Sequence, residues 1–123
     1  MIICRIFISL LMMTGILFMD KNQRQLLIFG NDENPLLVQQ QLALLKKEAT
    51  GIKERDIKIT VVPKNDLLHK NYYVQAGLFT VILLGKDGTE KLRTDKILYP
   101  QKLFAIIDAM PMRQAEMKNK KNP

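Results

Sequence analysis

The chain has 123 residues, of which 47% are apolar and 25% charged, which fits one globular domain with a modest core and excludes a wholly disordered chain. Its net charge of +7 favours anionic surfaces as partners, although a solvated basic surface accounts for the same lysines. The sequence shows neither a groove-reading motif nor an aromatic stacking platform, so we expect no nucleic-acid partner.

The chain begins with an apolar run, residues 6–19, that follows a positive charge at Arg5. As a helix this run would be about 21 Å long, which is shorter than the roughly 30 Å hydrocarbon core of a bilayer. The pattern predicts a signal peptide over residues 1–19. Because no pair of small residues marks a cleavage site, an uncleaved N-terminal membrane anchor is the alternative, and a buried core element is a third.

The cysteine content limits the chemistry of the mature protein. Cys4 is the one cysteine of the chain, so no intrachain disulfide forms. It lies within the predicted signal segment, and the mature domain, residues 20–118, would hold no thiol for catalysis. A basic tail, residues 119–123, completes the predicted organisation.

The next part of the chain predicts a strand, a helix and a second strand. QLLIF (25–29) is a short buried strand, and a helix follows over residues 35–49, opened by Pro35 and ended by Gly51. IKITVV (57–62) is the second strand. Two strands joined by one helix at this spacing form a right-handed crossover, so we expect them to be parallel.

Residues 64–76 predict a short helix lying on the sheet, and this stretch holds His69, the one histidine of the chain. No second histidine or available cysteine exists to complete a metal site with it, so we expect a surface side chain. Three methionines, Met110, Met112 and Met117, are more typical of packing around a helix break than of copper ligands. The sequence therefore predicts no metal site and no cofactor.

A β-hairpin is predicted over residues 79–94. FTVILL (79–84) lacks polar alternation, as expected of a strand covered on both faces, and TEKLRT (89–94) is polar, as expected near a sheet edge. GKDG (85–88) between them predicts a tight turn. It lacks the spacing of a phosphate-binding loop and joins two strands instead of opening a helix.

The last long helix is predicted to begin at Pro100, which suits a first helical turn, and to end before Pro111. A second, frayed helix is expected over residues 112–118. Apolar residues three and four positions apart form the buried face of the first helix: Leu103, Phe104, Ile106, Ile107 and Met110.

Three segments carry a resemblance to a known family: QQQLALLKKEATGIKERDIKI, GLFTVILLGKDGTEKLR and LFAIIDAMPMRQAEM. They resemble an uncharacterised family of short exported bacterial proteins, a domain of unknown function. That family is similar to the thioredoxin-like DUDES domain of vertebrate sushi-repeat and extracellular-matrix proteins. The resemblance covers residues 24–118 and is most specific where GKDG-x-x-K-L-R is followed by IDAMPMR-x-x-EM. It implies a fold and an exported location, without an established reaction.

The predicted order of elements, β-α-β followed by β-β-α, is the layout of a thioredoxin-like α/β fold. Such a fold has a central mixed sheet with helices packed on it, and here the N-terminal apolar helix would lie outside the domain. Redox-active thioredoxins carry two cysteines where the first strand meets the first helix, and a cis-proline before the third strand. GNDENP (30–35) stands in the first place, and AGLFT (76–80) in the second lacks proline. We therefore expect neither disulfide exchange nor peroxidase chemistry.

The loop that replaces the cysteines is the candidate ligand-binding site. Ligands of open α/β sheets collect beyond the carboxyl ends of parallel strands. The sequence places polar residues there or close by: Asn31, Asp32, Glu33, Asn34 and Thr80. The alternative interpretation is structural, with Asn34 capping the next helix and two carboxylates near its positive end. No catalytic residue is assigned.

The sequence thus predicts an exported thioredoxin-like domain without redox cysteines that binds an unknown protein or polymer partner in the periplasm or outside the cell. One alternative is electrostatic association with anionic lipid or polymer through Lys118, Lys120 and Lys121, helped by a retained membrane anchor. Another is an enzyme that uses Asp32 or Glu33 as an acid or base, which requires a pocket around them.

Overall fold

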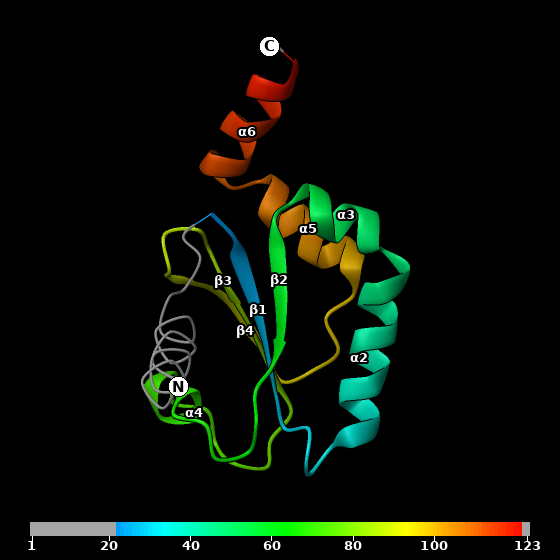
Figure 1. Cartoon of the computed structure of the whole chain (residues 1–123), viewed down its shortest axis with the longest axis vertical. Helices are drawn as coiled ribbons and strands as arrows, with labels where there is room; N and C mark the ends of the chain where they lie inside the picture. Colours follow the sequence, from blue (N-terminus) through cyan, green and yellow to red (C-terminus); the bar gives the residue numbers. More distant parts are fainter. Residues whose placement is uncertain (1–21, 122–123) are drawn as a thin grey trace, which may run out of the picture.

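A mixed sheet of four strands forms the centre of the molecule (Figure 1). The structure is a computed structural model that describes residues 22–121. The strands are β1 (Arg24–Phe29), β2 (Ile57–Val61), β3 (Thr80–Leu84) and β4 (Glu90–Thr94). They lie in the order β2-β1-β3-β4, with β1 parallel to β2 and antiparallel to β3, and β3 antiparallel to β4. The predicted α/β fold with a mixed sheet is confirmed.

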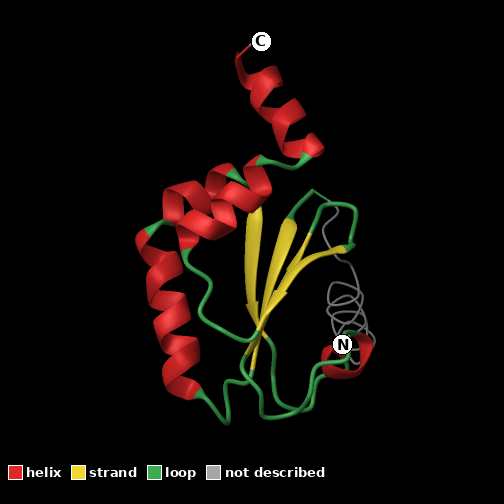
Figure 2. Cartoon of the chain, turned by 180° about the vertical axis from the view of Figure 1, so that it is seen from behind, coloured by secondary structure: helices red, strands yellow, loops and turns green. Residues whose placement is uncertain are grey.

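Five helices of the described chain accompany this sheet. They are α2 (Pro35–Lys47), α3 (Ala49–Glu54), α4 (Leu68–Asn71), α5 (Pro100–Asp108) and α6 (Pro111–Lys121). Figures 1 and 2 show α2, α3 and α5 on one face of the sheet and α4 on the other, while α6 extends away from the body. The sheet is thus covered on both faces, as the apolar strands require.

β1 contributes to both halves of the core because successive side chains of a strand point to opposite faces. Leu26 and Ile28 belong to the apolar cluster that α2, α3 and α5 complete, whereas Leu27 and Phe29 belong to the cluster on the α4 side. Every residue of β3 is buried as well, as its unbroken apolar run predicted.

A buried amide fixes the connection from β4 to α5. The side chain of Gln41 on α2 donates from Nε2 to the Leu98 carbonyl oxygen at 2.8 Å and accepts the Leu98 N–H at Oε1 at 2.7 Å. Gln41 and Leu98 are both buried, so these bonds satisfy polar groups that water does not reach. They hold the loop before α5 against α2.

The helix end predicted at Gly51 is wrong. α2 ends at Lys47, and Gly51 lies within α3. A Cβ atom at Gly51 would lie 2.6 Å from the ring of Phe104 on α5, and the Arg55 guanidinium covers the same ring at 4.0 Å from its centroid. Glycine is therefore needed at this position for the close approach of α3 to α5, and not to end a helix.

The ends of the chain differ in what the structure describes. α6 runs from Pro111 to Lys121, so it is longer than the frayed helix expected over residues 112–118 and includes part of the predicted tail. None of the helices within residues 22–121 combines the length and apolar character needed to cross a bilayer. The predicted signal peptide or anchor, with Cys4, lies outside the described residues.

Candidate functional site

The loop between β1 and α2, the predicted binding site, lies against the segment that leads into β3. Gly30 has a φ of +95°, and a Cβ atom there would lie 2.7 Å from the Leu78 carbonyl oxygen and 2.9 Å from the Phe79 Cα. These distances leave no room for a side chain, and the positive φ strains any residue other than glycine. Glycine at this position lets the two segments touch.

Asn34 joins the same two segments through its side chain. Its Nδ2 donates to the Gly77 carbonyl oxygen at 2.7 Å, and its backbone N–H donates to the Gly30 carbonyl oxygen at 2.8 Å. Asn34 occupies the N-cap position of α2 as expected, but its side chain makes no capping hydrogen bond to the helix. Because the amide is engaged with Gly77, the loop is fastened to the entry of β3.

The structure brings three of the five predicted ligand residues together around one small pocket. Asn31, Asp32 and Glu33 line a space of about 10 Å³, which holds one water molecule at most. Lys64 Nζ lies 3.3 Å from the Glu33 carboxylate at the same place. Thr80 is buried in β3 and does not line this pocket. Ligand binding by these residues stays a prediction.

His69 lines this pocket too, which the sequence did not indicate. It is half-buried on α4, and its ring meets the Phe29 ring edge-on at a centroid distance of 5.0 Å. Its Nδ1 lies 3.2 Å from the Asp66 carbonyl oxygen. His69 is thus a packing residue in the pocket wall, and residues 22–121 contain no group of three potential metal ligands.

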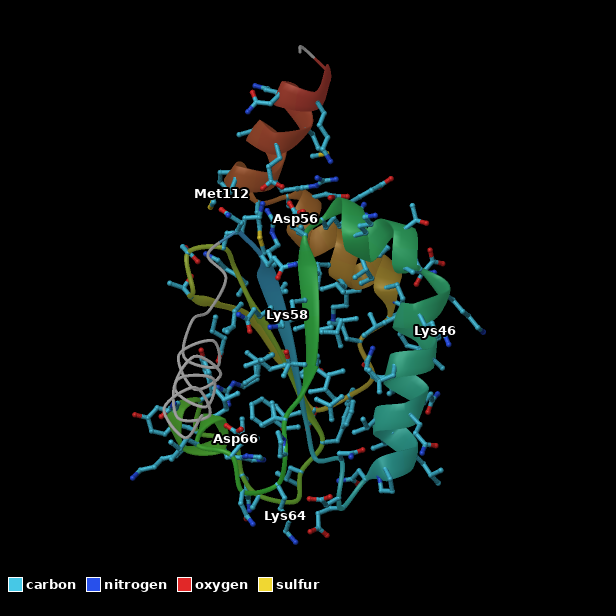
Figure 3. All side chains as sticks on the ribbon, in the orientation of Figure 1. Lys46, Asp56, Lys58, Lys64, Asp66 and Met112 are labelled. Carbon is cyan, nitrogen blue, oxygen red and sulfur yellow. The ribbon has the colours of Figure 1, made fainter. Side chains whose placement is uncertain are left out.

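A second concentration of polar side chains lies at the opposite end of the sheet, where α6 leaves the body. Figure 3 shows Asp56 and Met112 at this end. At its centre is Arg24, whose side chain is 1% exposed. Its Nη1 donates to the Arg55 carbonyl oxygen at 2.8 Å and its Nη2 to the Glu116 carboxylate at 3.0 Å. Arg24 thereby joins β1 to the end of α3 and to α6.

Ion pairs extend this group of charges. Lys86, in the turn between β3 and β4, lies 3.1 Å from Glu116 and 2.9 Å from Asp56. Asp108, at the end of α5, lies 2.8 Å from Arg55 and 3.2 Å from Arg113. We call the following seven residues the charged cluster: Arg24, Arg55, Lys86, Arg113, Asp56, Asp108 and Glu116.

The two motifs that carry the family resemblance build much of the charged cluster. GKDG supplies Lys86, and IDAMPMR-x-x-EM supplies Asp108, Arg113 and Glu116. The sequence predicted these motifs as a turn and as helices, and their meeting in space was missed. No pattern in the sequence indicated this meeting, since the burial of Arg113, at 5% exposure, is a property of the folded chain.

The charged cluster changes the acidity of its carboxyl groups. A hydrogen bond from Arg55, helped by Arg113, holds the pKa of Asp108 below its ordinary value despite partial burial. Burial raises the pKa of Glu116, but hydrogen bonds from Arg24 and Lys86, together with their charges, lower it by more. Both carboxyl groups are therefore ionised in neutral solution, where they stabilise the folded chain.

A wider hollow of about 430 Å³ lies between β2 and the helices α2 and α3. Its wall is mostly aliphatic and includes Leu45, Ile52 and Ile57, from α2, α3 and β2. Lys58 on β2 is exposed, and a charged residue on an edge strand discourages pairing with a further strand. We assign no chemistry to this apolar surface.

Comparisons with known proteins identify the family and a similar fold. The family described as "Domain of unknown function (DUF4174)" matches residues 18–116, which is most of the chain, so the chain belongs to this family. A solved structure described as "Structure of a malarial protein" has a TM-score of 0.52 and 24% sequence identity, over 71% of this chain and 96% of that one. At this identity the likeness bears on the fold alone. No curated protein matches at a significant level.

We predict that acid weakens the fold through Asp108 and Glu116. A carboxyl group whose pKa is lowered by folding contributes stability above its unfolded pKa, near 4.5 for Glu116, and loses it as the pH falls through the folded value. Glu116→Gln should cost about 1 to 3 kcal/mol of unfolding free energy at neutral pH. It should also flatten the loss of unfolding free energy in acid, because glutamine has no carboxyl group to protonate. Urea unfolding followed by circular dichroism over a pH series measures both effects.

Glu48→Gln is the matched control, because Glu48 is exposed between α2 and α3 and lies outside the charged cluster. This variant should keep the wild-type stability and the wild-type acid dependence. An unchanged acid dependence in Glu116→Gln would mean that the charged cluster does not govern stability in acid.

Proposed function

We propose that this member of the DUF4174 family is an exported, thioredoxin-like binding domain that performs no thiol redox reaction. The topology supports the scaffold, since a parallel β1-β2 pair linked by helices is followed by antiparallel β3 and β4 and then by α5. The likeness to a solved structure supports a shared α/β fold and does not bear on the thioredoxin-like assignment. Export and similarity to the DUDES domain belong to this proposal, and their support comes from the sequence motifs and the N-terminal apolar run.

The β1–α2 loop is the observation that carries the proposal. Where a redox-active thioredoxin has two cysteines, this chain has a loop fastened to β3 through Gly30 and Asn34, and residues 22–121 contain no cysteine. A pocket of about 10 Å³ also offers no room for a substrate beside Asp32 and Glu33, so acid-base catalysis by these two gains no support. A scaffold without reactive groups still offers surfaces for binding, and a protein or polymer of the cell envelope is the proposed partner.

Introducing two cysteines tests the scaffold. With Cys4→Ser as the background, Glu33→Cys and Leu36→Cys together create a C-x-x-C sequence at the start of α2 and leave Asn34 in place. Both positions are exposed, so the core is undisturbed. We expect the wild-type chain to reduce no insulin disulfides. The double variant should form an internal disulfide and gain measurable activity, because a helix N-terminus stabilises a thiolate.

The two single-cysteine variants are the controls for this experiment, since neither can close a disulfide within the loop. A double variant that forms no internal disulfide would argue against the thioredoxin-like scaffold. Activity of the wild-type chain would argue against the loss of redox chemistry.

Export is tested on the natural chain in its cell. We expect the protein in the periplasm, the medium or the membrane fraction, beginning near residue 20 if the signal peptide is cleaved or retaining Met1 if it serves as an anchor. Cell fractionation followed by mass spectrometry of the N-terminal peptide distinguishes these forms. A chain that begins at Met1 and is recovered only from the cytoplasm contradicts export.

Electrostatic association with anionic lipid or polymer is a second candidate function, and the position of α6 favours it. α6 extends from the body, as Figures 1 and 2 show, and its Lys118 and Lys120 are exposed. Lys121 is the last residue of the same helix. Lysines on a projecting helix can approach a charged surface without hindrance from the rest of the domain.

Replacing Lys118, Lys120 and Lys121 by glutamine should weaken binding to phosphatidylserine vesicles about a hundredfold at low salt, since each lysine contributes about 1 kcal/mol near such a surface. Co-sedimentation measures the binding. The matched control replaces three exposed lysines of α2 and α3 by glutamine: Lys46, Lys47 and Lys53. Equal losses in both triple variants, or binding that does not weaken as salt rises, would exclude this function.

A further inference from the structure

A pocket of about 210 Å³ lies beside the charged cluster, between the β3–β4 turn and the junction of α5 with α6. It has a cationic wall and an apolar wall, formed respectively by Arg24, Lys86 and Lys91 and by Met110, Pro111 and Met112. We infer that this pocket binds a small organic monocarboxylate. The carboxylate lies against the cationic wall and the apolar part against the methionines.

The sharing of one carboxylate among three cations favours an anionic ligand. Glu116 lies 3.0 Å from Arg24, 3.1 Å from Lys86 and 3.8 Å from Arg113. Within the described chain, Lys86 and Arg113 each have a second carboxylate partner, and Arg24 does not. Arg24 is also the most buried of the three, so its charge is the one that water screens least. A single negative charge in the pocket would complete the neutralisation of Arg24.

The guanidinium of Arg24 also lacks one hydrogen-bond acceptor. Both of its Nη atoms donate hydrogen bonds, but the buried Nε has no partner among residues 22–121. A buried N–H without an acceptor is costly, and Arg24 is part of the pocket lining. A carboxylate in the pocket would add an anionic partner to a guanidinium whose hydrogen bonds are incomplete, and arginine pairs strongly with carboxylates.

One acidic residue, Asp87, also lines the pocket, and its charge is balanced within the hairpin turn. Its carboxylate accepts hydrogen bonds from the Thr89 N–H at 3.0 Å and the Thr89 hydroxyl at 2.8 Å, and Lys91 Nζ donates to it at 3.1 Å. These bonds, the Thr89 N–H first among them, hold the pKa of Asp87 at about 2. The carboxylate is thus engaged by its own turn, and Lys91 offsets its repulsion of an incoming anion.

The apolar wall and the volume define the rest of the ligand. Met112 is 50% exposed and lines the pocket together with Met110 and Pro111, at the junction of α5 with α6. Methionine side chains adapt their shape to a bound apolar group. The volume of about 210 Å³ corresponds to about seven water molecules at roughly 30 Å³ each. A carboxylate with a short alkyl or aryl group fits this space, whereas inorganic phosphate leaves the apolar wall unused.

This inference goes beyond the proposed function, because the pocket and the β1–α2 loop lie at opposite ends of the sheet. If the cysteine experiment failed, the inference about the pocket would still stand. If the pocket bound no carboxylate, the proposed function would still stand. The same carboxylate chemistry has two sources: a free small molecule, or the C-terminus of a polypeptide that ends in an apolar residue. The experiment therefore includes one probe for each source.

Hexanoate and an acetylated tripeptide ending in leucine are the two probes, each titrated into the full chain and followed by NMR chemical shifts. We expect saturable shifts confined to Arg24 and to residues 85–91 and 110–112, and no binding of hexanol or of the tripeptide amide. Tighter binding of the tripeptide acid would support a polypeptide C-terminus as the ligand. Tighter binding of hexanoate would support a free small molecule.

Two surface variants make the test specific to this pocket. Lys91→Gln should weaken binding of the tighter probe about tenfold by removing a charge, and Met112→Gln should weaken it by removing apolar contact. Lys64→Gln and Leu36→Gln make the same changes at exposed positions outside the pocket and should have no effect. Equal losses in the control variants, phosphate binding as tight as the organic probes, or the absence of saturation would overturn the inference.

Discussion

Burial of one guanidinium constrains the end of the molecule from which α6 leaves. Removing a charge from water is costly, so Arg24 at 1% exposure depends on acceptors that other segments bring to it. The Arg55 carbonyl comes from the end of α3 and the Glu116 carboxylate from α6, and the backbone N–H of Arg24 donates to the Asp56 carbonyl at 2.7 Å. These contacts hold three segments at the start of β1. On α6 itself the one buried side chain described is the charged Arg113, so polar contacts do much to position that helix.

Backbone contacts, one amide and an exposed ion pair, between Lys64 and Glu33, close the other end of the sheet. Gly30 admits the chain at Leu78 and Phe79 without a side chain between them, and Asn34 bonds the carbonyl oxygen of Gly77. A reactive centre needs groups that are free to meet a substrate. In this loop the side-chain amide of Asn34, at the start of α2, already donates a hydrogen bond to the Gly77 carbonyl oxygen. The predicted ligand site thus also serves as a junction between two segments, and the wider pocket, beside the charged cluster, lies at the other end.

The α/β fold with its mixed sheet was predictable because local sequence determines most of its strands and helices. Unbroken apolar runs gave β1 and β3, and the two prolines that open α2 and α5 marked both helix starts as predicted. Differences arose where a residue serves a distant partner: Gly51 makes room for Phe104, and the side chain of Asn34, at the N-cap of α2, bonds the entry of β3 instead of its own helix. The charged cluster was missed for the same reason. Arg24 and Glu116 are 92 positions apart, and no periodicity along the chain links two such residues.

The pocket and the attachment of α6 depend on the same cations. Arg24 and Lys86 line the pocket, and both also hold Glu116 of α6. A helix docked mainly by apolar packing keeps its position when acid or salt is added, because burial of apolar surface does not depend on charge. A helix held through shared ion pairs responds to both, since protonation removes the anion and salt screens the more exposed pairs. The exposed Lys118 and Lys120 lie on this helix, so the charge state at the base of α6 also affects where these two lysines stand.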